Sequence, residues 1–165
     1  MATAPPAALN RAVPTTTEGS IVPGQHRQVI SEGVATRTLL PSESGALCLF
    51  DLAAGVVYTL PAPVVGMQFE FGTTIDGTGS YKIITNSSSV FITGGLFIVS
   101  LTVAEAGDTF VANGTSHVAI TMDADTEGRL KGATRIQLTA ISSTVWHCTG
   151  YSTGAGTLAD PFATS

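Results

Sequence analysis

The densest group of acidic side chains in this sequence lies at Asp123, Asp125 and Glu127, and Gly128 follows it directly. Carboxylates at alternate positions before a glycine are typical of the start of a calcium-binding loop, because Ca2+ prefers oxygen ligands. Such a loop ends with a bidentate glutamate at its last ligand position, where this chain has Thr134. We therefore predict a solvated acidic turn and no metal site here, with calcium binding as the alternative.

The potential nucleophiles and histidines form no recognisable catalytic set. His26, His117 and His147 are far apart in the sequence, and none has metal-ligand spacing to a cysteine or an acidic residue. Ser116 precedes His117 but lacks the Gly-x-Ser-x-Gly sequence of a nucleophile elbow. His147 and Cys148 are adjacent, so on a strand they point to opposite faces. We expect neither enzyme activity nor a cofactor.

The segments around these side chains are short, apolar and rich in β-branched residues. Met67, Phe69 and Phe71 alternate with two polar residues, which indicates a half-buried strand. Gly, Pro, Asn and Asp separate similar segments at intervals of about 8–12 residues, and apolar residues nowhere recur at helical spacing over three turns. The sequence therefore predicts an all-β fold, namely an antiparallel β-sandwich or barrel of about ten short strands.

Glycine-rich sequences predict where the strands are joined. Residues 76–79, Asp-Gly-Thr-Gly, predict a hairpin between strands at residues 69–74 and 80–85. Gly94-Gly95 predicts a turn that ends the strand before it. The apolar run at residues 96–103 is then a strand of its own, which we expect to be buried on both faces or at a subunit contact.

The last hairpin is expected to join residues 134–141 to residues 144–149. By alternation, one face of it carries the side chains that we expect in the core: Ile136, Leu138, Ala140, Trp146 and Cys148. The other cysteine, Cys48, lies in another apolar segment. A chain without a secretion signal favours buried free thiols over a disulfide bond between these two cysteines, which is the alternative.

The composition is poor in charge. Of the 165 residues, 44% are hydrophobic and 12% are charged, and the net charge is −5. Lysine and arginine form no cluster, so nucleic acid is not an expected partner. The longest apolar run is far shorter than the roughly 20 residues that span a bilayer, so no membrane partner is expected either. Such a surface suits a protein that is packed against another protein.

Residues 1–34 differ from the rest of the chain. Ala, Pro, Thr, Gly and Ser dominate them, and four prolines interrupt any regular period. They predict an extended N-terminal arm with one short strand at residues 28–30. The arm precedes a β-body at residues 35–165 with a Gly/Ser/Thr-rich tail, and we expect the body to fold without it. The arm is either a disordered leader or a segment that becomes ordered on a partner. Its start lacks the features of a signal peptide, which predicts synthesis in the cytoplasm without secretion.

One stretch of the chain carries a resemblance to a known family. Ser44-Gly45 opens it, Thr59-Leu60-Pro61-Ala62-Pro63 follows a strand, and Ile83-Ile84-Thr85-Asn86 follows the aromatic strand. Near the C-terminus, a hairpin precedes Gly150-Tyr151 and a glycine-rich tail. Across residues 42–151 this pattern resembles the capsid decoration (cement) proteins of tailed bacteriophages, and similar modules occur in phage tail fibres.

The resemblance implies a structural protein on the virion surface. It would bind the outside of the assembled head, contact the major capsid protein, bridge neighbouring subunits and form a homo-oligomer, as a closed homotrimer. Residues 1–40 contain three arginines and two glutamates, whereas residues 41–165 contain four basic and ten acidic residues. Because positive charge is concentrated near the arm, we expect these residues to contact the capsid: Leu9, Arg11, Ile21, Arg27 and Arg37.

The alternative function is a carbohydrate- or receptor-binding module of a tail fibre. Such a module needs a row of exposed aromatic side chains. Three tyrosines are the candidates for it, Tyr58, Tyr81 and Tyr151. We expect the following aromatic side chains to pack in the core instead: Phe50, Phe69, Phe71, Phe97 and Trp146.

Overall fold

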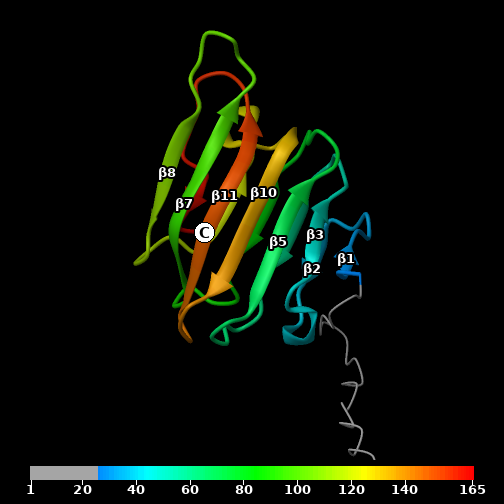
Figure 1. The fold of residues 1–165 in the computed structure, drawn as a ribbon, viewed down its shortest axis with the longest axis vertical. Coiled ribbons are helices and arrows are strands. Elements are labelled where there is room, and N and C mark those ends of the chain that lie inside the picture. Colours follow the sequence, from blue (N-terminus) through cyan, green and yellow to red (C-terminus); the bar gives the residue numbers. More distant parts are fainter. Residues whose placement is uncertain (1–25) are drawn as a thin grey trace, which may run out of the picture.

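The computed structural model describes residues 26–165, and it is a β-sandwich of two sheets (Figure 1). The larger sheet contains seven strands, which are, in spatial order, β1 (Val29–Ile30), β3 (Leu47–Phe50), β5 (Gln68–Thr73), β10 (Leu130–Ala140), β11 (Val145–Gly154), β7 (Phe91–Ser100) and β8 (Asp108–Asn113). The smaller sheet contains five, β12 (Phe162–Ala163), β9 (Ala119–Met122), β6 (Tyr81–Ile84), β4 (Val56–Thr59) and β2 (Thr36–Thr38). Two single-turn 3-10 helices, η1 (Pro41–Glu43) and η2 (Asp125–Glu127), lie between strands. The predicted all-β sandwich is confirmed.

Both sheets are mixed, whereas the sequence predicted antiparallel pairing. From β2 to β6 the chain crosses to the opposite sheet at every connection. Each crossing reverses the direction of the chain, so after two crossings it is back in the same sheet and runs in the same direction as before. β3 therefore pairs with β5, and β4 with β6, in parallel. The later strands β10 and β11 pair antiparallel, which confirms the predicted last hairpin.

The predicted hairpin at residues 76–79 is wrong for the same reason. The turn joins β5 of the larger sheet to β6 of the smaller one, so the two strands face each other across the core instead of pairing. Phe71 and Tyr81 are both fully buried, one from each sheet. Turn residues show that the chain reverses, but they do not distinguish a hairpin from a crossing between sheets.

The predicted turn at Gly94-Gly95 is also wrong, because β7 runs through both glycines without a break. Gly94 has a φ of +92°, and a Cβ atom there would lie 2.1 Å from the carbonyl oxygen of Cys148 on the neighbouring strand. The glycine is therefore needed for the close approach of β7 to β11 and for a left-handed backbone conformation.

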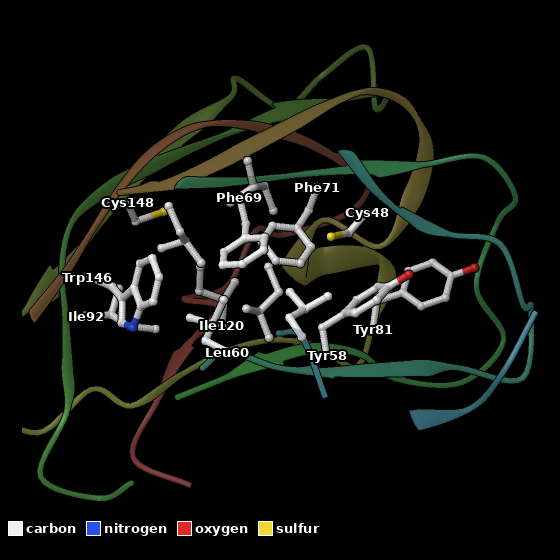
Figure 2. Close-up of a cluster of buried hydrophobic side chains, with 14 of the residues drawn as sticks. Cys48, Tyr58, Leu60, Phe69, Phe71, Tyr81, Ile92, Ile120, Trp146 and Cys148 are labelled. Carbon is white, nitrogen blue, oxygen red and sulfur yellow. The ribbon is translucent and has the colours of Figure 1, made fainter. Parts of the chain in front are cut away.

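One apolar core fills the space between the sheets (Figure 2). Aromatic rings occupy its centre: the ring of Phe50 stacks on that of Tyr81 with centroids 4.8 Å apart, and Phe69 packs at 6.0 Å from Trp146. All five side chains predicted to point inward from the last hairpin are buried, namely Ile136, Leu138, Ala140, Trp146 and Cys148.

Cys48 and Cys148 are buried free thiols, as predicted. Burial raises the pKa of each thiol to about 12, and for Cys48 the nearby Glu43 carboxylate adds to the effect. The ordinary value is 9.0, so at pH 8 the thiolate fraction falls by about a thousandfold. We expect the native protein to resist Ellman's reagent at pH 8 and to release two equivalents of thiol in denaturant. Fast labelling of the native protein would contradict this burial.

Candidate functional site

Arg27, predicted to contact a capsid, binds its own chain. Its guanidinium donates to the carbonyl oxygens of Gly45 (2.6 Å) and Ala46 (2.9 Å) and to the Glu70 carboxylate (2.8 Å). Two residues later, the edge strand β1 pairs with β3 and buries Ile30. The short strand predicted inside the arm is therefore part of the larger sheet, and the folded unit extends back to Arg27.

Arg37 is also paired within the chain. Its guanidinium hydrogen-bonds the buried carboxylate of Glu43, and Glu32 lies 3.5 Å from its Nε atom. Glu43 in turn accepts a hydrogen bond of 2.7 Å from the backbone N–H of Leu40. The charge of Arg37 thus stabilises the turn before β3. The other three predicted contact residues, Leu9, Arg11 and Ile21, lie outside the described residues.

Glu70 lies between two arginines on the outer face of the larger sheet. Arg135 Nε approaches its carboxylate at 3.0 Å, opposite Arg27 at 2.8 Å. Burial by itself raises the pKa of this carboxyl, but the hydrogen bonds from Arg27 and then Arg135 outweigh it, so the pKa of Glu70 is lowered. The ionised carboxylate therefore stabilises the fold.

Replacing Glu70 by Gln should lower the free energy of unfolding by about 1–2 kcal/mol at pH 7, between the values for exposed and buried pairs. Because the folded-state pKa is depressed, this stabilisation is complete above the ordinary pKa of 4.5 and is lost as the pH falls below it. Urea melts of both proteins from pH 7 to pH 3 test the prediction. A stability difference that does not shrink at low pH would contradict it.

The carboxylates of the acidic turn at residues 123–127 bind groups of the chain itself. Asp125 pairs with Arg129 at 2.8 Å, and Glu127 accepts the backbone N–H groups of Asp123 (2.7 Å) and Ala124 (3.2 Å). The Asp123 carboxylate accepts a hydrogen bond from the hydroxyl of Ser80. Within residues 26–165, no three His, Cys, Asp or Glu side chains converge in a way that could hold a metal ion.

The predicted sugar-stacking tyrosines are mostly buried. Tyr58 and Tyr81 lie in the core, and their hydroxyls donate to the carbonyl oxygens of Leu49 (2.8 Å) and Ile75 (2.9 Å). Tyr151 alone of the three is exposed, at 40%. Phe97, predicted in the core, is 42% exposed instead, because it points outward from β7. Its neighbours Leu96 and Ile98 are fully buried, so β7 is buried on one face only and not on both within this chain.

An exposed apolar surface lies around the β7–β8 connection. Phe97 is the register partner of Tyr151 on β11 and of Thr109 on β8, so these side chains share the outer face of the sheet. The chain then enters a loop that projects beyond the end of the sandwich (Figure 1, light green). We call the exposed apolar residues of this region the β7–β8 patch, which comprises Phe97 (42%), Leu101 (59%), Val103 (105%), Val111 (66%) and Tyr151 (40%).

A second exposed apolar surface lies at the opposite end of the sandwich, where β10 ends and β11 begins. Val64 and Val65 are 61% and 70% exposed in the loop before β5, and Ile141 is 52% exposed. The loop is held against β10 because the N–H of Gly66 donates to the carbonyl oxygen of Ala140 at 2.9 Å. We call these three residues the Val64–Ile141 patch. The loop that carries Leu101 and Val103 also exposes Glu105, and Asp108 follows it, so acidic side chains border the β7–β8 patch. Exposed apolar side chains grouped in this way suit contact with another protein surface.

No helix in residues 26–165 is long and apolar enough to cross a membrane.

Comparison with known proteins gives no family assignment. No family model matches the chain, and no curated protein or solved structure matches it either. The function is therefore inferred from the residues and geometry above.

Proposed function

We propose that this protein decorates the outer surface of a bacteriophage head and joins neighbouring subunits of the major capsid protein without covalent bonds. The observation that supports this most is the presence of two exposed apolar patches at opposite ends of one sandwich. A protein that bridges two neighbours needs two separate contact surfaces. Burial of apolar surface is the dominant favourable term in most protein association.

A closed homotrimer would strengthen such bridging. Each copy carries both patches, so three linked copies present several weak contacts to the shell at once. The low charge of the chain agrees with a protein that is stable when packed against others. This proposal makes the protein a structural component of the virion surface with no catalytic step.

A carbohydrate-binding module of a tail fibre is the second candidate. The observation that favours it is the side-by-side placement of Phe97 and Tyr151, two exposed aromatic rings on one face of the larger sheet. Aromatic faces of this kind provide large contact area at low conformational cost. Binding of the protein to a glycan array, abolished by Tyr151→Ala, together with failure to bind heads, would favour this candidate.

The decisive experiment sediments undecorated heads of the same phage with the protein. Leu101→Ser/Val103→Ser removes apolar area from one patch and Val64→Ser/Val65→Ser from the other, while Val34→Ser is the control, because Val34 is exposed outside both patches. We expect each patch variant to bind at least about tenfold more weakly, since burying one such side chain contributes about 1.5–3 kcal/mol. Patch variants that bind heads like the wild type would refute the proposal.

A further inference from the structure

A groove of about 510 Å³ lies on the outer face of the smaller sheet. Its apolar lining consists of Val57 on β4, Ile84 on β6 and Val118 just before β9. Val57 and Ile84 point away from the core, since the residues that alternate with them on β4 and β6, Val56, Tyr58 and Ile83, are buried inside it. The volume lies within the range of about 300–1,000 Å³ that is usual for ligand-binding sites.

Lys82 is the only charged side chain that lines this groove, and Ser165, the last residue of the sequence, lines it as well. No carboxylate of residues 26–165 forms an ion pair with Lys82, that of Ser165 included. It lies on β6 between Val57 and Thr121 in the register of the sheet and is half-buried. All four arginines among the described residues pair with carboxylates of the chain: Arg27, Arg37, Arg129 and Arg135. In residues 26–165 the cations without such a partner are Lys82 and Lys131, and only Lys82 lies in the groove.

The rim of the groove offers further hydrogen-bonding groups. Asn86 and Ser88 belong to the loop after β6, and Thr164 lies near the end of the chain. Within the described part of the chain, these three side chains make no hydrogen bond to another residue. The groove therefore combines an apolar strip, one cation and several free polar groups.

We propose that this groove binds an extended acidic peptide segment whose carboxylate pairs with the Lys82 ammonium. The apolar strip takes an aliphatic side chain beside the acidic one, and the rim groups bind the peptide backbone. The source of the segment rests on the proposed function: it belongs to the capsid subunit. Arg27 and Arg37, which were expected to bind acidic capsid groups, are paired within the chain, and Lys82 is a cation that has no such pair.

The same lining argues against other ligands. No aromatic side chain lines the groove, so a sugar ring finds no stacking surface there. A single lysine on a chain with a net charge of −5 cannot neutralise a run of phosphates. Lys82 can pair with one carboxylate, which an acidic peptide supplies.

The test uses the full-length protein and two matched lysine variants. Lys82→Met removes the charge but keeps an aliphatic side chain in the groove, and Lys131→Met makes the same charge change away from it. The probe is a capped Val-Asp-Val-Glu-Val peptide, compared with its neutral Asn/Gln form, and binding is followed by NMR shifts of the labelled protein. Thermal melts establish that both variants are folded.

We expect the acidic peptide to shift the amide signals of Val57, Lys82, Ile84 and Val118. The neutral peptide and the Lys82→Met variant should bind about fivefold more weakly, as expected for one solvent-accessible ion pair, and Lys131→Met should bind like the wild type. No shift at millimolar peptide, or shifts that glucuronic acid produces and the peptide does not, would overturn the inference.

Binding to heads separates this inference from the proposed function. If heads bind the wild type and Lys131→Met but bind Lys82→Met more weakly at low salt, the capsid is the source of the segment. Heads that bind all three proteins equally, with no peptide binding, would overturn the inference and leave the decoration function standing. Lys82-dependent peptide binding without head binding would support the groove and refute the capsid as its partner.

Discussion

A Gly94→Ala variant should lose about 3–4 kcal/mol of unfolding free energy, a large effect for one methyl group. Backbone strain and a steric clash both contribute to this loss. The left-handed φ of +92° is unfavourable for alanine, and the new Cβ would lie 2.1 Å from the carbonyl oxygen of Cys148. Strands β7 and β11 would have to separate inside the larger sheet, beside the buried Trp146.

Gly72→Ala is the matched control. Gly72 lies in β5 of the same sheet, its φ is not positive, and the nearest atoms to a new Cβ are 3.6 Å away, at ordinary contact distance. The free energy of unfolding of Gly72→Ala should stay within about 1 kcal/mol of the wild-type value. Thermal melts compare them: Gly94→Ala should lower Tm by about 10 °C. Equal stability of the two variants would show that β7 and β11 do not approach so closely.

These glycines also show what the sequence could predict about the fold. The strands of the last hairpin followed from alternation, because their apolar side chains, Trp146 among them, share one buried face. Strand pairing did not follow, because turn sequences such as residues 76–79 reverse the chain equally well within a sheet or between sheets. Gly94 acts through a neighbour 54 residues away in the sequence, Cys148, and local propensity contains no information about that contact.

The candidate surfaces were harder to predict for a related reason. Whether Arg27 is free to bind a partner depends on Glu70, which is distant in sequence and adjacent only through the pairing of β3 with β5. Lys82 could not be selected from the sequence either, because it differs from the arginines of the described residues only in having no ion pair, and ion pairs depend on the fold. The β7–β8 patch was missed because the apolar run at residues 96–103 predicted one strand, whereas β7 ends at Ser100 and Leu101 and Val103 lie in the loop after it.

The second prediction concerns where the folded unit begins. The strand β1 buries Ile30, and Ser31 and Gly33 donate hydrogen bonds to the Asp51 carboxylate at 2.7 and 3.1 Å. Arg27 adds two hydrogen bonds to carbonyl oxygens and one ion pair. A chain that starts at residue 35 loses all of these contacts, whereas a chain that starts at residue 26 keeps them.

We therefore expect the 26–165 chain to melt close to the full-length protein and the 35–165 chain to melt about 6–12 °C lower. The loss corresponds to about 3 kcal/mol, of which burial of Ile30 contributes about half. Cooperative unfolding should persist in the shorter chain, since the aromatic core between the sheets lies after residue 46. An Ile30→Ala variant of the full-length protein should reproduce about half of the shift. If both truncated chains melt at the same temperature, β1 and the Arg27 contacts do not contribute to the stability of the sandwich, and the folded unit begins after residue 34.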